Sequence, residues 1–215
     1  MVNTVNIFEA LDIKTLLIIF HFIGLAFGAG GAWISDLIII RFLQFEPISS
    51  EKLKLVHFLT NLVTIGLCIL WVTGLGFIIH YSIFEPENVL NPKVWSKVSI
   101  VVVLSFNGYL LHRFILPILN NNEGKTLFYS ITHKQKIIMT LIGSVSLVSW
   151  GFPVLLGASK GLNFTVSAFE ILTSYVVAVM IVSTIVYFVV KRFTKDEQSL
   201  QDTEQGLEAK DHDHE

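Results

Sequence analysis

Five long apolar runs constrain this chain more than any other feature of its sequence. They cover Ile13–Phe45, Leu53–Tyr81, Val94–Leu119, Ile137–Leu156 and Phe164–Val190. Each run has the roughly 20 residues that an α-helix needs to cross about 30 Å of hydrocarbon at 1.5 Å per residue. Backbone polar groups must be paired internally in lipid, so the runs are expected to be helices rather than open strands. The sequence therefore predicts an all-α polytopic membrane bundle of five transmembrane helices within residues 1–193.

Composition agrees with a membrane protein that ends in a polar segment. The chain is 53% hydrophobic and 15% charged, whereas soluble domains carry about 25% charged residues. Residues 194–215 hold eight of the 17 acidic residues and no aromatic residue, so we expect a disordered acidic tail. Cys68 is the single cysteine, which excludes a disulfide within one chain. No nucleic-acid-binding motif is present.

The positive charges are distributed unevenly between the two sides of the predicted bundle. Eleven of the 15 Lys and Arg residues lie in the first and third connections and the tail, and four lie on the other side. Cytoplasmic loops carry the excess of Lys and Arg in membrane proteins. The charges therefore predict an N-terminus outside and a C-terminus in the cytoplasm.

Four polar residues fall near the outer ends of the predicted helices. Counting 1.5 Å per residue places His21, His80, Lys97 and Glu170 in a similar outer layer. Imidazole is a common haem ligand, so this layer is a candidate site for a haem iron or a metal ion. Two structural interpretations stay open, namely His80 as an interfacial anchor and Lys97 with its amine extended toward the headgroups.

A second polar layer is expected near the inner side, centred on Asp36. This carboxylate lies in an otherwise apolar run, where a charged group needs a partner or marks a functional site. His57, His112 and Arg113 are the candidate partners at matching depth. The layer is a structural ion pair that fixes the bundle, a relay for protons or ions, or a network on the propionate side of a cofactor.

Two segments carry a resemblance to known families. Phe20-His-Phe-Ile-Gly24 and Val94-Trp-Ser-Lys97-Val-Ser-Ile resemble segments of HemJ-type protoporphyrinogen oxidases, and the first helix is also similar to CopD-type copper-resistance proteins. The resemblance implies haem b held with the help of His21 and Lys97. The run Gly28-Ala-Gly-Gly-Ala32 followed by Ser35-Asp36 resembles uncharacterised bacterial membrane proteins, which implies a location in the bacterial inner membrane.

These observations support two classes of function, with a third left open. The first is a haem b-binding membrane protein with a redox role, a HemJ-like oxidoreductase in one form, with His21 as an axial ligand and Lys97 or His80 as the opposite ligand or a propionate contact. The second is a transporter or channel for protons or a metal ion, although three Met residues are few for copper. The third is a membrane subunit without chemistry of its own. The lipid bilayer is the expected partner in each case, with a redox partner protein in the first and homo-oligomers as a further expectation.

Overall fold

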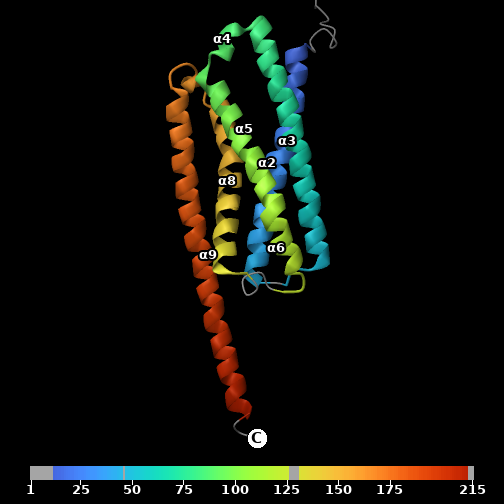
Figure 1. The fold of residues 1–215 in the computed structure, drawn as a ribbon, viewed down its shortest axis with the longest axis vertical. Helices are drawn as coiled ribbons and strands as arrows, with labels where there is room; N and C mark the ends of the chain where they lie inside the picture. The colour runs from blue at the N-terminus through green and yellow to red at the C-terminus, as the bar shows by residue number, and fades with distance from the viewer. Residues whose placement is uncertain (1–11, 46, 126–130, 213–215) are drawn as a thin grey trace, which may run out of the picture.

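Five helices long and apolar enough to cross a membrane make up the fold. The computed structural model describes residues 12–45, 47–125 and 131–212, with side chains at 12–40, 47–125 and 131–192. The main helices are α2 (Ile13–Phe45), α3 (Ser50–Phe84), α5 (Pro92–Leu110), α8 (His133–Ala158) and α9 (Ala168–His212), which run up and down (Figure 1). The described part of the chain contains no strand. The expected all-α bundle is confirmed.

Polar first turns explain why two helices begin before the apolar runs do. The hydroxyl of Ser49 accepts a hydrogen bond from the backbone N–H of Lys52, so α3 begins at Ser50. Thr132 and Gln135 form a reciprocal capping box at the start of α8. Capping side chains satisfy N–H groups that have no partner inside the helix. The helices therefore extend into polar sequence at the expected membrane surface.

The third span is interrupted by a π-helical turn. After α5 the chain forms η1 (Leu111–Ile115), a π-helix, and then α6 (Leu116–Asn121). Pro117 follows within α6. Proline has no N–H to donate and its ring conflicts with the carbonyl four residues earlier, which accounts for a local change in the hydrogen-bond pattern. The remaining short elements are α4 (Pro86–Val89) and the 3₁₀ turn η2 (Lys160–Leu162).

Helices α2 and α3 pack closely because glycines line their crossing. A Cβ atom on Gly66 would overlap the backbone of Gly28, and one on Gly24 would come within 2.9 Å of Ile69. Trp150 of α8 lies directly over Gly28. The small-residue stripe of the first helix is thus filled by neighbouring residues, as expected for close packing between transmembrane helices.

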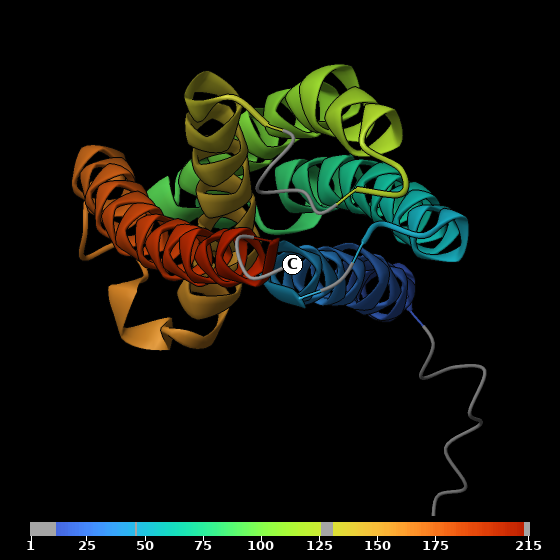
Figure 2. The same ribbon diagram turned by 90° about the horizontal axis from the view of Figure 1, so that it is seen from below.

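Helix α9 is the peripheral element of the bundle. It packs against α8 and α5 at one side of the other four helices (Figure 2). Only 6% of its apolar window is buried, against 39% for α8. In a bilayer most of this window would contact lipid.

The structure differs from the predicted disordered tail at residues 194–215. Helix α9 continues without a break to His212 and projects beyond the other helices (Figure 1), while residues 213–215 lie outside the described part. The physical reason is that nucleation is the costly step of helix formation. A segment rich in Glu, Gln, Lys and Leu can extend a helix that the membrane span has already nucleated.

Candidate functional site

The outer polar residues do not form one layer. His21 on α2 faces Thr73 on α3, with 2.8 Å between Nδ1 and Oγ1. His80 lies seven residues beyond Thr73 on the same helix, which is two turns or roughly 10 Å. The two histidines are therefore at different depths, and the structure does not bring them together.

The hydrogen bonds of Thr73 define the tautomer of His21. The Thr73 hydroxyl donates to the carbonyl of Ile69 at 2.7 Å, so it accepts from Nδ1–H of His21. A neutral imidazole with a proton on Nδ1 has a lone pair on Nε2. The amine of Lys97 lies beside Gly157 near the end of α8, where an added Cβ would be 3.8 Å from Nζ.

Aromatic and capping contacts account for the other two outer residues. The ring of His80 packs against Phe84, with 4.9 Å between centroids, and edge-on against Tyr81. Glu170 forms a capping box with Ser167 at the start of α9, accepting hydrogen bonds from its backbone N–H and its hydroxyl. The capping box gives Glu170 a structural role. The ring of His80 is held by aromatic contacts, while its Nδ1 is buried without a hydrogen-bond partner among the described residues.

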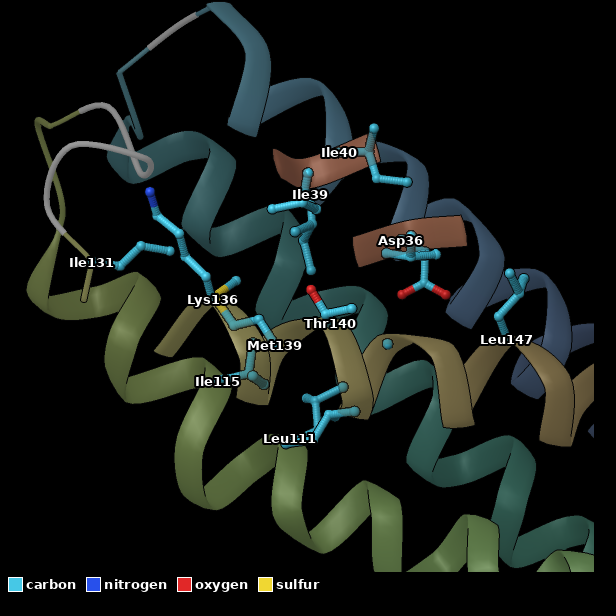
Figure 3. A pocket seen from close by; sticks show the side chains of 14 residues that line it. Asp36, Ile39, Ile40, Leu111, Ile115, Ile131, Lys136, Met139, Thr140 and Leu147 are labelled. Carbon is cyan, nitrogen blue, oxygen red and sulfur yellow. The ribbon is translucent and has the colours of Figure 1, made fainter. Parts of the chain in front are cut away.

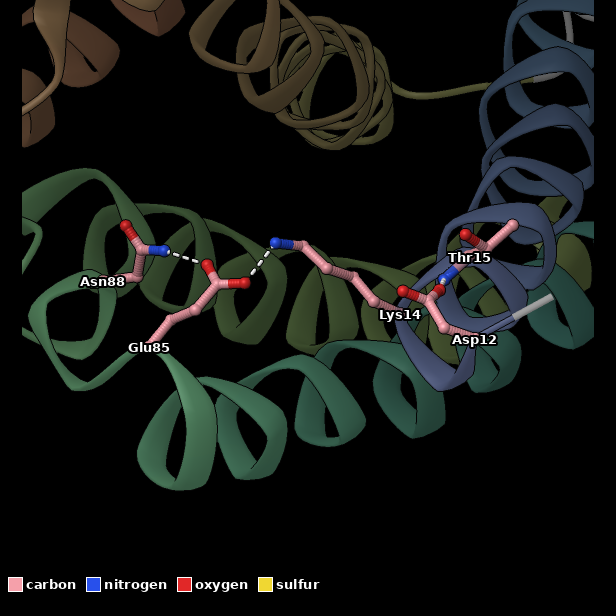
Figure 4. A network of polar contacts seen from close by, with 5 residues as sticks. All are labelled: Asp12, Lys14, Thr15, Glu85 and Asn88. Atoms are coloured by element: carbon pink, nitrogen blue, oxygen red, sulfur yellow. Dashed lines mark hydrogen bonds and ion pairs between the residues drawn. The ribbon is translucent and has the colours of Figure 1, made fainter. Parts of the chain in front are cut away.

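A network of paired charges that the sequence did not indicate closes the outer end. Lys14 of α2 forms an ion pair with Glu85, which also accepts a hydrogen bond from the Asn88 side chain (Figure 4). The hydrogen bond from Lys14 holds the pKa of the Glu85 carboxyl below its ordinary value. Hydrogen bonds from Thr15, first from its backbone N–H, likewise lower the pKa of Asp12.

A second outer lysine is buried and fully engaged. Lys93 is 5% exposed, and its Nζ donates to the carbonyl of Ser159 at 2.8 Å and to Oδ1 of Asn163 at 2.7 Å. These bonds tie the start of α5 to the connection between α8 and α9. They are structural contacts between helix ends.

Asp36 on the inner side is not paired with the residues expected to reach it. His57 contacts Asn120 instead, with 3.0 Å between Nε2 and Oδ1. The side chains of His112 and Arg113 are exposed, because the π-helix η1 places them away from the bundle. Oδ2 of Asp36 is buried and has no hydrogen-bond partner among the described residues. The expected inner ion pair is therefore absent from the described part of the chain.

The Asp36 side chain faces a cavity between four helices. The cavity has a volume of about 120 Å³ and is bounded by α2, η1, α8 and α9. Figure 3 shows the carboxylate pointing toward α8, with Thr140 nearby and Lys136 extending away from it. Most of the lining is apolar, including Ile39, Leu111, Ile115, Met139 and Val186. The π-helix thus contributes directly to the wall, and π-turns within helices occur frequently at functional sites.

Three buried hydroxyls lie on the same helices as the cavity lining. The hydroxyl oxygens of Ser35, Ser144 and Ser183 are buried without a partner in the described residues. Ser35 and Ser144 are next in sequence to Asp36 and Gly143, which line the cavity, and Ser183 is three residues before Val186. Unsatisfied buried polar atoms are rare in folded proteins and require an explanation such as bound water or function.

The residues at the outer site fit a haem only in part. Nε2 of His21 has the lone pair that an axial ligand needs. The glycines that would let a macrocycle approach α2 are filled by Ile69 and Trp150, and His80 is two turns from the level of His21. A single histidine ligand at His21 fits this geometry, and a His21–His80 pair does not. The described residues contain no cluster of three or more His, Cys, Asp or Glu side chains that could hold a metal ion.

Sequence reasoning missed the cavity and found one of its polar residues. Asp36 was apparent because a carboxylate in an apolar run is unusual, whereas Thr140 has no distinguishing pattern. Pro117 was the one available signal for the π-turn, since proline disturbs a regular helix.

Comparison with known proteins identifies no relative of this chain. No family model, curated protein or solved structure matches the chain. The five apolar helices indicate an integral membrane protein.

Proposed function

We propose that this membrane protein moves protons across the bilayer, and that Asp36 is the group that takes up and releases them. The observation that carries the proposal is the buried, unpartnered Oδ2 of Asp36 at a partly open cavity between four helices. An ionised carboxylate without a partner is costly in an apolar environment. The free-energy cost of the ionised form therefore favours the uptake of a proton by Asp36.

The described residues favour a proton over a metal ion. Asp36 is the acidic side chain among the residues that line the cavity, and the described residues contain no group of three or more His, Cys, Asp or Glu side chains that could hold a metal ion. The buried hydroxyls of Ser35, Ser144 and Ser183 lie on the same helices as the lining and can both donate and accept hydrogen bonds.

The proposed orientation places the Asp36 cavity toward the cytoplasm. The cavity is near the end of the bundle from which α9 extends, opposite α4 and the start of α2 (Figure 1). Lys and Arg residues are concentrated at this same end, and the positive-inside rule assigns it to the cytoplasmic side. The protein would then lie in the bacterial inner membrane.

Proton flux into liposomes tests the proposal. The purified protein is reconstituted with an internal pH-sensitive dye, and a potassium gradient with valinomycin supplies the driving force. Wild type should acidify or alkalinise the lumen according to the imposed potential, and Asp36→Asn should reduce the rate to that of empty liposomes. Glu87→Gln is the matched control, because Glu87 is an exposed carboxylate in α4. Equal flux in wild type and Asp36→Asn would refute the role of Asp36.

A haem-linked redox role is the second candidate, supported by the tautomer of His21. A hydrogen bond at Nδ1 leaves Nε2 for the metal, an arrangement common among metal-ligating histidines. Lys97, which the resemblance to HemJ-type proteins pairs with His21, would contribute a positive charge for a haem propionate. When bound, haem b would supply one-electron chemistry, and a redox partner protein would then be required.

An absorption spectrum separates this candidate from proton transport alone. Detergent-purified protein is scanned before and after dithionite. A Soret band that is lost in His21→Ala and retained in His80→Ala would support a haem on His21. A colourless wild-type sample that remains colourless after incubation with haemin would exclude it.

A further inference from the structure

The Asp36 cavity has the size of a small organic ring. Its volume is about 120 Å³, and an apolar cavity of roughly 150 Å³ in another protein stays dry and binds benzene. Apolar side chains form most of the wall here too, among them Ile39, Leu111 and Met139. A ring is a better occupant than water, because each water needs two or more polar partners.

The carboxylate of Asp36 favours ring compounds that carry a hydrogen-bond donor. Oδ2 of Asp36 is a buried acceptor without a donor in the described residues. A neutral ligand with a hydroxyl group would supply that donor. A cationic amine is disfavoured, because transferring a charge into an apolar cavity is costly.

The cavity is accessible from the membrane. Ile40 and Leu147 line it and are 44% and 40% exposed at the surface of the bundle. In a bilayer this surface faces acyl chains, so a molecule dissolved in the lipid can reach the opening without crossing water. The opening is next to α9, which has few buried residues.

We infer that the cavity between α2, η1, α8 and α9 binds the ring of a small lipid-soluble aromatic alcohol, whose hydroxyl donates a hydrogen bond to Asp36. The ligand class comprises phenols and the phenol-type head groups of larger lipids. The inference uses the carboxylate of the proposed function, but binding does not require proton movement across the membrane.

Fluorine NMR in lipid nanodiscs tests the inference with two matched probes. 4-Fluorophenol and fluorobenzene have similar rings, and the hydroxyl is the main difference. We expect a saturable shift of the 4-fluorophenol signal in wild type, with about tenfold weaker binding of fluorobenzene, because the hydrogen bond to Asp36 is lost. Asp36→Leu should remove the difference between the probes. Equal affinity of the two probes in wild type would overturn the role of the hydroxyl.

A pair of glycine variants on one helix tests the location. Gly143 lines the cavity, and a Cβ added there has no atom within 4 Å. Gly143→Leu should therefore fill the cavity and abolish saturable binding. Gly151 on the same helix also faces open space and is not part of the lining, so Gly151→Leu should bind normally. Binding retained in Gly143→Leu would overturn the assigned site.

The wild-type titration keeps the inference testable if a variant fails to fold. Absence of any saturable component for 4-fluorophenol in wild-type nanodiscs refutes it outright. Proton flux that depends on Asp36, without binding of 4-fluorophenol, would refute the ligand and leave the proton role standing. Binding without flux would support the ligand and refute the proposed function.

Discussion

Three charged side chains at the outer end of this bundle differ from Asp36 at the inner end in their pairing. The outer side chain of His80 does not share in this contrast, because its Nδ1 is also buried without a hydrogen-bond partner among the described residues. At the outer end Lys14, Glu85 and Lys93 each have a partner. At the inner end the Asp36 oxygen has none among the described residues, and it faces a cavity. A charged residue in an apolar sequence therefore marks a candidate functional site when the folded protein leaves it without a partner. A charged residue that is paired in the folded protein is accounted for by its structural contact.

Helix packing also differs between the crossing of α2 and α3 and the Asp36 cavity. Gly66 and Gly28 lie at a closed helix crossing, where no methyl group fits. Gly143 lies at the cavity, where added atoms meet open space. The cavity therefore lies beside the unpartnered carboxylate, while the crossing of α2 and α3 at Gly28 and Gly66 is closed.

The largest expected effect is at the closed crossing. Gly66→Ala places a Cβ against the backbone of Gly28, and backbone atoms can move only if the helices separate. We expect a loss of about 2–4 kcal/mol in the free energy of unfolding in mixed micelles, typical of severe overpacking. Gly143→Ala should change stability by less than about 0.5 kcal/mol. Similar losses for both variants would contradict the proposed difference in packing.

The second largest loss of stability is expected for a substitution at the buried Lys93. Lys93→Met removes the donor to the Ser159 carbonyl and the Asn163 amide oxygen. Ser159 is half-buried and Asn163 is exposed, so losing the charged donor should cost about 1–2 kcal/mol, and thermal unfolding should occur at a lower temperature. Lys160→Met is the control, because that side chain is exposed. An unchanged unfolding temperature in Lys93→Met would mean that this contact is not maintained in the membrane.

A substitution at Asp36 should raise the free energy of unfolding, whereas the two substitutions above lower it. Asp36→Leu replaces an unpartnered buried polar group with an apolar one, which we expect to stabilise the protein by about 1 kcal/mol. Thermal unfolding of the purified variant gives the measurement. Destabilisation would indicate that Asp36 has a partner in the native membrane, and the contrast between Asp36 and the paired outer charges would then fail.

The smallest effect concerns the pH dependence of the outer ion pair. The ordinary pKa of a glutamate is 4.5, and the hydrogen bond from Lys14 lowers that of Glu85 in the folded protein. The stabilisation by this pair is therefore fully present above about pH 4.5 and is lost as the pH falls through the lowered value. Stability of wild type and Lys14→Met, measured from pH 7 to pH 3, should converge at low pH. A constant difference across this range would contradict the ion pair.

Individual residues show how far the sequence could be interpreted. Asp36 and His21 were identified because each is isolated in an apolar run. Their partners were not, since Thr73 and Thr140 are ordinary residues until helix rotation brings them to the site. Glu170 was assigned to an outer layer by depth alone, although a Ser-x-x-Glu pattern at Ser167 indicates a capping box.

The sequence by itself determined five membrane-spanning helices, because length and apolarity are properties of a single segment and the bilayer supplies a fixed thickness to match. Tertiary structure alone decided which polar groups are paired, which glycines are closed over, and where a cavity remains. Those outcomes depend on the rotation and depth of one helix relative to another, and no pattern within one segment of the chain specifies them.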